Sequence, residues 1–343
     1  MQEQVYDFRS DTVTKPTGEM KQAMSRAPVG DDAFSEDPTT NALQEKVAEM
    51  TGFEAALFVP SGSMGNLTAL MCHTRPGQIL YSGRMSHIKI YELGGYARIA
   101  GLNLIEIDDS QEGLDLEALK EAWSPGSYML PVPGIVTVEN TQNMLGGMIY
   151  SEQKLAELAV FTRDKGVPLH MDGARLWHAA QALGQPLTHW TRHVDSVMLC
   201  LSKGLGAPVG SVLAGSKAFI QSALSIRKLL GGGMRQSGVL AAAGLHAIEH
   251  HLPELGSDHA RCQQVAEELA DLPWLQVTPP QTNILIVRVT QGDAADFVSD
   301  MQERGILFFA VAQDRIRIVF HRDLSEQACQ ALVAAIKGWG ASR

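Results

Sequence analysis

The chain has 343 residues, of which 45% are hydrophobic and 19% charged, and its formal net charge is −10. This length exceeds the usual limit of a single hydrophobic core, so we expect one large domain and one smaller domain. The acidic balance argues against nucleic acid and anionic membrane surfaces as partners. No apolar run approaches the length that spans a bilayer.

The cysteines and the first residues indicate the compartment. The four cysteines are scattered without a CxxC pair, as expected of unpaired thiols in a reducing environment and not of a disulfide framework or a metal site. The first residues, MQEQVYDFRSD, lack the apolar segment of a signal peptide. We therefore expect a cytoplasmic globular protein.

The first recognisable segment, residues 7–16 (DFRSDTVTKP), is polar and ends in a proline. Polar leaders of this kind usually cover a surface. This one also gathers donor groups, from Arg9, Ser10, Thr12 and Thr14, that suit an anion. Short helices are expected over residues 17–25 and 40–51.

From Glu54 onward, short apolar segments alternate with helical patterns. This alternation predicts an α/β fold, with a mainly parallel sheet sandwiched by helices. Ligands of such sheets bind beyond the carboxyl ends of the strands. The expected strands cover residues 55–59, 78–82, 103–107, 135–139, 167–171, 194–201 and 208–213. The expected helices cover residues 66–73, 83–97, 115–123, 152–165, 176–183, 217–230 and 239–251.

The pattern changes near Pro253, and we place the domain boundary there. Residues 1–253 would form an N-terminal arm and the large domain. Residues 254–343 would form a small C-terminal α+β domain. Its expected helices cover residues 258–269, 294–304 and 325–339, and its expected strands cover residues 282–289, 307–309 and 316–320.

A turn of small residues, Pro60 to Gly65 (PSGSMG), leads from the first expected strand into a helix. Such a turn exposes backbone N–H groups beside the positive end of the helix dipole, which suits a phosphate. A plain connection between a strand and a helix gives the same pattern, so the turn alone leaves both interpretations open.

Lys203 follows the apolar run 194–201 and enters a loop of glycine, alanine and proline. A lysine at the end of a core strand, among residues that let a ligand approach the backbone, suits a carbonyl-reactive amine. Taken alone, a solvated loop lysine is the more common explanation.

Asp172 stands directly after the expected strand 167–171. A carboxylate there can pair with a protonated ring nitrogen, although aspartates also commonly cap the helix that follows. A site for pyridoxal 5'-phosphate (PLP) needs three features: an aspartate at one strand end, a lysine at the end of the next strand, and a turn that binds phosphate. The combination favours PLP, held by Lys203 as a Schiff base.

Eight ordered motifs extend this interpretation over nearly the whole chain. With them the sequence resembles the low-specificity L-threonine aldolases, PLP enzymes of the aspartate-aminotransferase fold (fold type I). The motifs are RSDTVTKP (9–16), VGDDAFSEDP (29–38), FVPSGSMGN (58–66), VENTQN (138–143), HMDGAR (170–175), CLSKGLGAPVGS (200–211), GGGMRQSG (231–238) and TNILIVRV (282–289).

The resemblance implies a role for each matching residue. Lys203 and His87 would be catalytic, and no metal is expected. The implied substrate contacts are Ser10, Tyr91, Arg175 and Arg317. The implied cofactor contacts are Gly62, Ser63, His87, Asp172, Arg175, Lys203, Lys228 and Arg235.

Two of the implied cofactor contacts also indicate the oligomeric state. By resemblance, Lys228 and Arg235 reach the cofactor from a neighbouring subunit, so we expect a homo-oligomer, with a tetramer favoured over a dimer. Without the resemblance they would pass for a solvated helix end.

Several positions depart from the family pattern. Phe34 replaces a common tyrosine, Gln142 a histidine and Phe320 a threonine, and Tyr128 and Met129 stand near the usual place of another histidine. These changes remove polar groups that we expect around the substrate, and they leave His87 as the best candidate for the base that acts on the β-hydroxyl group.

The resulting hypothesis is PLP-dependent cleavage of L-threonine, L-allo-threonine or a related β-hydroxy-α-amino acid to glycine and an aldehyde. The alternative is a β-eliminating lyase or an amino-acid racemase on the same scaffold, which would use the same lysine and aspartate. A binding protein without activity is a third possibility, against which the joint presence of Lys203, Asp172 and Arg175 argues.

Overall fold

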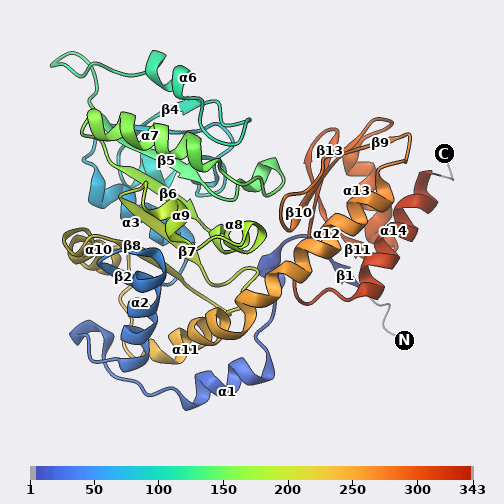
Figure 1. The fold of residues 1–343 in the computed structure, drawn as a ribbon, viewed down its shortest axis with the longest axis horizontal. Helices are drawn as coiled ribbons and strands as arrows, with labels where there is room; N and C mark the ends of the chain where they lie inside the picture. Colours follow the sequence, from blue (N-terminus) through green and yellow to red (C-terminus); the bar gives the residue numbers. More distant parts are fainter. Residues whose placement is uncertain (1–4, 341–343) are drawn as a thin grey trace.

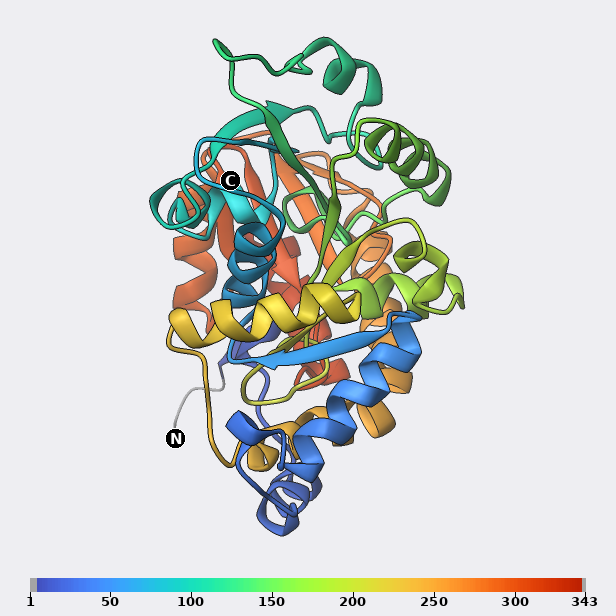
Figure 2. The same cartoon turned by 90° about the vertical axis from the view of Figure 1, so that its left-hand side faces the viewer.

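The computed structural model describes residues 5–340, which form a large and a small domain (Figure 1). A seven-stranded sheet forms the centre of the large domain, with the strand order β2-β8-β7-β6-β5-β3-β4. Figure 2 looks onto the β2 edge of this sheet. Its strands are β2 (Ala55–Val59), β3 (Ile79–Gly83), β4 (Asn103–Ile107), β5 (Pro133–Glu139), β6 (Leu169–Gly173), β7 (Ser196–Cys200) and β8 (Ser211–Gly215).

All neighbouring strands of this sheet are parallel except the pairs that include β8, which runs antiparallel to β7 and β2. The mainly parallel sheet expected from the sequence is therefore confirmed. Between β7 and β8 the chain reverses through Gly206 and Gly210, whose φ angles of 76° and 104° favour glycine. This direct return needs no crossover helix, and it places Lys203 on the connecting loop.

Alternate residues of the central strands pack on opposite faces of the sheet, as the pleat requires. Phe58 and Leu199 join the core under α2, α7, α8 and α11, whereas Leu57 and Met198 join a second core under α3 and α10. Both faces are thus covered, which explains the continuous apolar strands. The helices of this domain are α1 (Gly18–Arg26), α2 (Pro38–Thr51), α3 (Gly62–His73), α4 (His87–Ile90), α5 (Gly95–Arg98), α6 (Leu116–Glu121), α7 (Glu152–Asp164), α8 (Leu176–Leu183), α9 (Thr188–Thr191), α10 (Lys217–Leu229) and α11 (Gly238–His246).

The three largest differences from the expected helices concern α3, α4 with α5, and α11. Helix α3 begins four residues early, because the hydroxyl of Ser61 accepts a hydrogen bond from the Met64 amide and caps the first turn. The helix expected over 83–97 is two short ones, α4 and α5, because Leu93 and Gly94 adopt left-handed conformations. Helix α11 ends at His246 and continues as a π-helical turn, Ala247–His251.

The small domain is built on a four-stranded antiparallel sheet with the order β12-β13-β10-β9. A long helix, α12, leads into it from the large domain (Figure 1). Its helices are α12 (Leu255–Leu269), α13 (Ala294–Glu303) and α14 (Glu326–Gly340), and its strands are β9 (Leu275–Val277), β10 (Ile284–Val289), β11 (Ile306–Leu307), β12 (Phe309–Ala312) and β13 (Arg315–Val319).

The first described residues lie against this small domain. Strand β1 (Tyr6–Asp7) pairs in parallel with β11, and Phe8 is fully buried in the small-domain core. The sequence analysis did not anticipate this contact. The division at residue 254 stays a prediction, to which the structure adds that residues 6–8 pack with the C-terminal part of the chain.

Within residues 5–340, we find no helix with the length and apolar character that a membrane crossing requires.

The packing of α2 gives a test of the large core. Leu43 is fully buried between α2 and α11, close to Gly244. We expect Leu43→Ala to lower the free energy of unfolding by about 2–5 kcal/mol, because it removes buried methyl groups and leaves a cavity. Urea denaturation followed by circular dichroism measures this. The control Leu229→Ala, at a side chain that is 72% exposed, should change it by about 0.5 kcal/mol or less. Equal effects of the two changes would contradict this packing.

Candidate active site

A cavity of about 430 Å³ opens beyond the carboxyl ends of the strands of the large sheet, where strand β12 of the small domain faces it. Six residues predicted from the sequence line it: Ser10, His87, Tyr91, Arg175, Lys203 and Arg317. Thr12, which the sequence analysis named only as a possible anion donor, also lines it. Four further lining residues were given no role from the sequence: Asn143, Phe309, Ala310 and Val311. The cavity is thus built from the N-terminal segment, the large domain and the small domain together.

Lys203 lies in the loop after β7 and is half-buried. The hydroxyl of Thr14 donates to its backbone oxygen at 3.0 Å, while its amine has no hydrogen bond or ion pair with any residue of the range 5–340. The loop needs glycine at position 204, since a Cβ there would lie 2.4 Å from Nε2 of His178. The tight loop therefore presents a free amine to the cavity.

Asp172 is the second-last residue of β6 and is only 2% exposed. Its Oδ1 accepts a hydrogen bond from the Ala174 amide at 3.0 Å, and its Oδ2 accepts one from Nδ2 of Asn66 at 2.8 Å. Helix α8 starts at Leu176, and Asp172 bonds none of its amides. The capping role that the sequence left open is therefore wrong, and the carboxylate is held beside the cavity.

Two guanidinium groups meet at one amide oxygen. Arg175 donates from Nε and Nη2 to Asp11 at 2.8 and 2.7 Å, and from Nη1 to Oδ1 of Asn143 at 3.3 Å. Arg317 donates from Nη1 to the same Oδ1 at 2.8 Å. Burial and the charge of Arg175 lower the pKa of Arg317. Two cations brought together in this way suit a carboxylate, whose charge would offset their repulsion.

His87 begins α4, and its backbone amide donates to Oε2 of Glu139 at 2.7 Å. Its Nδ1 lies 3.0 Å from Oε1 of Glu92, and its ring lies 5.4 Å from that of Tyr91. Burial lowers the pKa of His87, but the Glu92 hydrogen bond and the charge of Asp172 outweigh it and raise that pKa above its usual value. With Nδ1–H directed to Glu92, the lone pair on Nε2 remains free to accept a proton.

Glu92 and Asn66 are site residues that the sequence analysis missed. Nδ2 of Asn66 donates to Glu92 at 2.9 Å as well as to Asp172. His87, Glu92 and Asp172 bring ligand atoms within 4.8 Å of one another, a spacing that a metal ion could also use. Because the Asn66 amide already donates to both carboxylates, we interpret the group as a hydrogen-bonded network.

The remaining cofactor residues predicted from the sequence lie outside this cavity. Gly62 and Ser63 form the first turn of α3. Lys228 and Arg235 line a separate cavity of about 480 Å³, and Arg235 lies 3.5 Å from Asp31. One chain alone does not bring these two cations to Lys203, so their role across a subunit interface stays a prediction.

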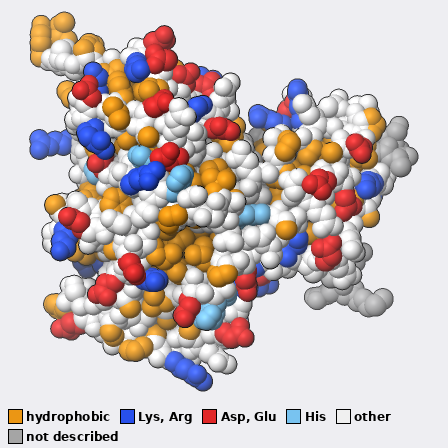
Figure 3. Space-filling view, viewed as in Figure 1, with side chains coloured by type: hydrophobic (Ala, Val, Ile, Leu, Met, Phe, Trp, Pro, Cys, Tyr) orange, Lys and Arg blue, Asp and Glu red, His pale blue; other side chains and the backbone are white. Residues whose placement is uncertain are grey.

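The positions that depart from the family pattern also lie away from the Lys203 cavity in this chain. Phe320 is buried and packs against Phe8 at 5.6 Å between ring centroids, so the expectation that it shapes the substrate pocket is wrong. Phe34 is 72% exposed, and Tyr128 and Met129 are 97% and 72% exposed. Hydrophobic side chains gather at the tip of the loop between α6 and β5 (Figure 3).

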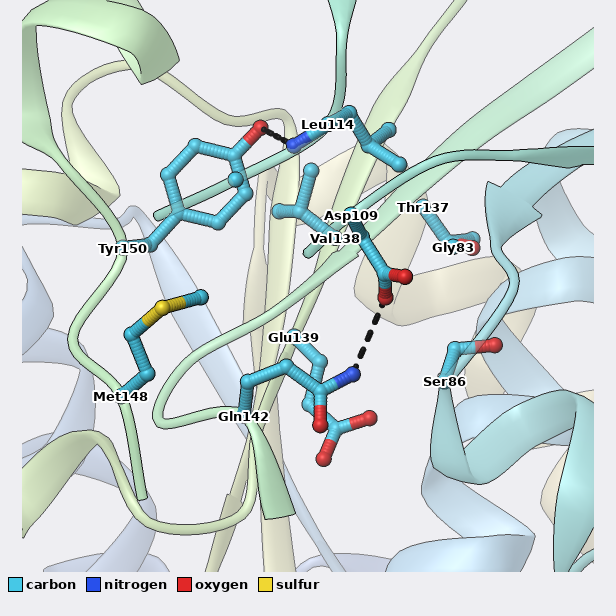
Figure 4. Close-up of a pocket in the computed structure, with 11 residues that line it drawn as sticks. Gly83, Ser86, Asp109, Leu114, Thr137, Val138, Glu139, Gln142, Met148 and Tyr150 are labelled. Carbon is cyan, nitrogen blue, oxygen red and sulfur yellow. Dashed lines mark hydrogen bonds between the residues drawn. The ribbon is translucent and has the colours of Figure 1, made fainter. Parts of the chain in front are cut away.

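Gln142 lines a smaller cavity, together with Glu139, and its side-chain amide lies toward Asp109 (Figure 4). Its Nε2 donates to Oδ2 of Asp109 at 3.0 Å, and its Oε1 accepts from the Met144 amide at 2.8 Å. The Asn143 amide donates to Oε1 of Glu139 at 2.9 Å. Gln142 and Glu139 therefore hold the loop that presents Asn143 to the two arginines.

Comparisons with known proteins agree with this geometry. A family model described as β-eliminating lyase matches residues 7–291. Low-specificity L-threonine aldolase 1 of Arabidopsis thaliana is 42% identical over 329 residues, which cover 93% of this chain and 92% of the relative. The low-specificity L-threonine aldolase of Escherichia coli (strain K12) is 40% identical, with 96% and 97% covered.

Solved structures share the fold. A threonine aldolase from Leishmania major superposes with a TM-score of 0.83 at 18% identity, covering 98% of this chain and 99% of its own. A putative L-allo-threonine aldolase from Listeria monocytogenes gives a TM-score of 0.82 at 19% identity, covering 98% and 97%. With the matches in sequence, the chain belongs to the β-eliminating lyase family and, within it, to the low-specificity L-threonine aldolases.

Proposed function

We propose that this protein cleaves L-threonine, L-allo-threonine or a related β-hydroxy-α-amino acid to glycine and an aldehyde, with PLP as cofactor. One observation carries the proposal. A free lysine amine and two arginines, Lys203, Arg175 and Arg317, face the same cavity. An amine that can bind a carbonyl and a cationic pair that can bind a carboxylate are the two groups that an amino-acid-cleaving PLP enzyme needs.

The residues around the cavity fit PLP. Lys203 would bind the aldehyde carbon, Asp172 the ring nitrogen, and the first turn of α3 with Gly62 and Ser63 the phosphate, where a helix N-terminus favours an anion. His87 would lie against the ring. When bound, PLP accepts the electrons that the broken Cα–Cβ bond leaves on the substrate.

The arginines would fix the substrate carboxylate. Asp11 holds Arg175 and Asn143 links Arg175 to Arg317, so both guanidinium groups are oriented before the substrate arrives. Ser10 and Tyr91 add hydroxyl groups to the same cavity. Fixing the carboxylate restricts rotation about the substrate's Cα, so the Cα–Cβ bond can stand perpendicular to the ring, where it breaks most easily.

His87 would take the proton of the β-hydroxyl group, directly or through a water molecule. Glu92 accepts the hydrogen bond from Nδ1, which leaves Nε2 as the basic nitrogen. This pair of a histidine and a carboxylate follows the usual arrangement, in which a third group orients a catalytic base.

We further propose a homo-oligomer, with a tetramer favoured over a dimer, in the cytoplasm. The exposed apolar tip between α6 and β5 supports a contact with a second copy, because monomers rarely leave such patches in water. The four cysteines, none of them in a disulfide, support a reducing compartment. Light scattering on the purified protein would measure the assembly.

The function is tested with a panel of substrates. We expect glycine and an aldehyde from β-hydroxy-α-amino acids, and an absorbance band of lysine-bound PLP that Lys203→Ala removes together with turnover. The control Lys217→Ala, at an exposed position, should keep both. Pyruvate from serine or cysteine, or racemised alanine, without glycine formation would instead support the β-eliminating lyase or the racemase. Absence of the visible band in the wild type would overturn the PLP proposal.

The carboxylate clamp is tested with Arg317→Lys. The change keeps the charge but removes the planar fork, at a cost of about 1.5–3 kcal/mol for a charge-assisted hydrogen bond. We expect kcat/KM to fall roughly 10- to 100-fold, mainly through KM. The matched control is Arg315→Lys on the same strand, where the side chain is 43% exposed and paired with Asp314. An unchanged KM in Arg317→Lys would contradict the clamp.

The base is tested by pH. His87 acts only when its Nε2 is unprotonated, so kcat/KM should rise as the pH rises through its raised pKa. Glu92→Gln removes the negative charge that stabilises protonated His87, and the acid limb of the profile should move to lower pH. The control Glu106→Gln, at an exposed ion pair with Lys89, should leave the limb in place. Full turnover by His87→Asn with intact PLP binding would show that His87 is not the base.

A further inference from the structure

A continuous hydrogen-bonded chain runs from Asp172 away from the cavity, between α3 and the strands β6 and β7. Asp172 accepts from Nδ2 of Asn66 at 2.8 Å, and Oδ1 of Asn66 lies 3.2 Å from Nε2 of His170. Nδ1 of His170 lies 2.9 Å from the hydroxyl of Ser196, which lies 2.8 Å from Nε2 of His73. We call these four side chains, Asn66, His170, Ser196 and His73, the Asp172 relay.

The fold dictates how these residues meet. Asp172 and His170 are two residues apart on β6 and so point to the same face of the sheet. Ser196 is the register partner of His170 on β7. Asn66 and His73 are seven residues apart on α3, two turns of one helix face. Asn66, His170 and Ser196 are fully buried.

The donor and acceptor of each hydrogen bond in the relay can be assigned by starting at Asp172, whose carboxylate can only accept. Asn66 donates to the carboxylates of Asp172 and Glu92, so its oxygen must accept, and His170 must carry its proton on Nε2. Burial lowers the pKa of His170 to about 3, so its ring is neutral and Nδ1 accepts the proton of the Ser196 hydroxyl.

The last bond follows the same rule. Once the Ser196 hydroxyl has donated to His170, its oxygen can accept from Nε2–H of His73. Burial lowers the pKa of His73 to about 4, so this ring is neutral too. All four hydrogen bonds therefore donate toward Asp172, and bonds aligned in one direction polarise and strengthen one another.

Within residues 5–340, the surroundings of Asp172 contain other acids and no paired lysine or arginine. Among the described residues it has no ion pair with a lysine or arginine, although it is almost fully buried. Two further carboxyl groups, of Glu92 and Glu139, lie close enough to oppose a charge on it. Hydrogen bonds that donate to a buried carboxylate replace the contacts with water that it has lost.

We propose that the Asp172 relay is a positioning device that orients Asp172 and directs hydrogen bonds to its carboxylate, so that the proton shared with the cofactor's ring nitrogen stays on the ring. The proposal rests on the PLP function stated above. The proposal gives the four relay residues a role in the chemistry of the cofactor ring. Only Asn66 bonds Asp172 directly; His170, Ser196 and His73 would act through it. A purely structural role would stabilise the domain without changing the protonation of that ring.

The experiment breaks the relay at its middle with Ser196→Ala. The change removes one hydroxyl and leaves the packing nearly unaltered. The matched control is Ser82→Ala on β3, another fully buried serine of the same sheet, whose hydroxyl bonds Ser86 and Thr137 and not the relay. Each variant is reconstituted with PLP labelled with ¹⁵N at the ring nitrogen, and circular dichroism checks the fold.

We expect the ¹⁵N signal of the wild type and of Ser82→Ala at the position of a protonated ring. In Ser196→Ala it should move toward the neutral position, with PLP affinity reduced by several-fold to tenfold. His73→Phe, at the outer end of the relay, should give a smaller shift and serves if Ser196→Ala fails to fold. An unchanged ¹⁵N signal in the variants that fold would overturn the relay while leaving the PLP function intact. A wild type that binds no PLP would overturn the function itself.

Discussion

The site depends on one buried ion pair, between Asp11 and Arg175. The two side chains are almost fully buried, and Arg175 binds both carboxylate oxygens. Burial alone would raise the pKa of Asp11, but the charge and hydrogen bonds of Arg175 hold it well below its usual range. Asn283 of the small domain also donates to Asp11, at 3.3 Å. Three distant parts of the chain thus meet at one carboxylate, and losing either member of such a pair leaves an uncompensated charge that costs about 3–5 kcal/mol.

The three buried acids near the cavity have different partners, so each has a different electrostatic environment. Asp11 has a cation, whereas Asp172 has only amide hydrogen bonds. Glu139 accepts two backbone amides, yet burial and the charge of Asp172 raise its pKa to about 7. Asp11 orients a guanidinium group, Asp172 lies beside His87, and Glu139 joins the loops that carry His87 and Asn143. A change at any one of them alters the electric field at the others.

Local sequence signals predicted the strands and the loop lysine because both depend on nearby residues. Strand β4 agrees with the prediction at both ends, and Lys203 and Asp172 stand at strand ends where a sequence pattern can place them. Glu92 was missed because the sequence analysis expected one continuous helix there. In the structure α4 ends at Ile90, Leu93 and Gly94 adopt left-handed conformations, and Glu92 pairs with His87. Asn66 bonds Asp172 and Asp11 bonds Arg175, and both partners are more than a hundred residues away. No local pattern reveals such contacts, and comparison with a family pattern shows that Phe320 differs without showing that it packs against Phe8.

Strand β1 lies in the small domain, with consequences for how the molecule can be divided. Residues 6–8 bond to the backbone of residues 305, 307 and 319, and Nε2 of His321 lies 2.8 Å from the Asp7 oxygen. A fragment cut out as residues 254–343 would lack the Phe8 side chain that packs on Phe320 and the strand that pairs with β11. The small domain is therefore discontinuous in sequence. Ser10, which lines the cavity, and Asp11, which binds Arg175, follow residues 6–8 directly, so the segment that completes the small domain also reaches the candidate active site.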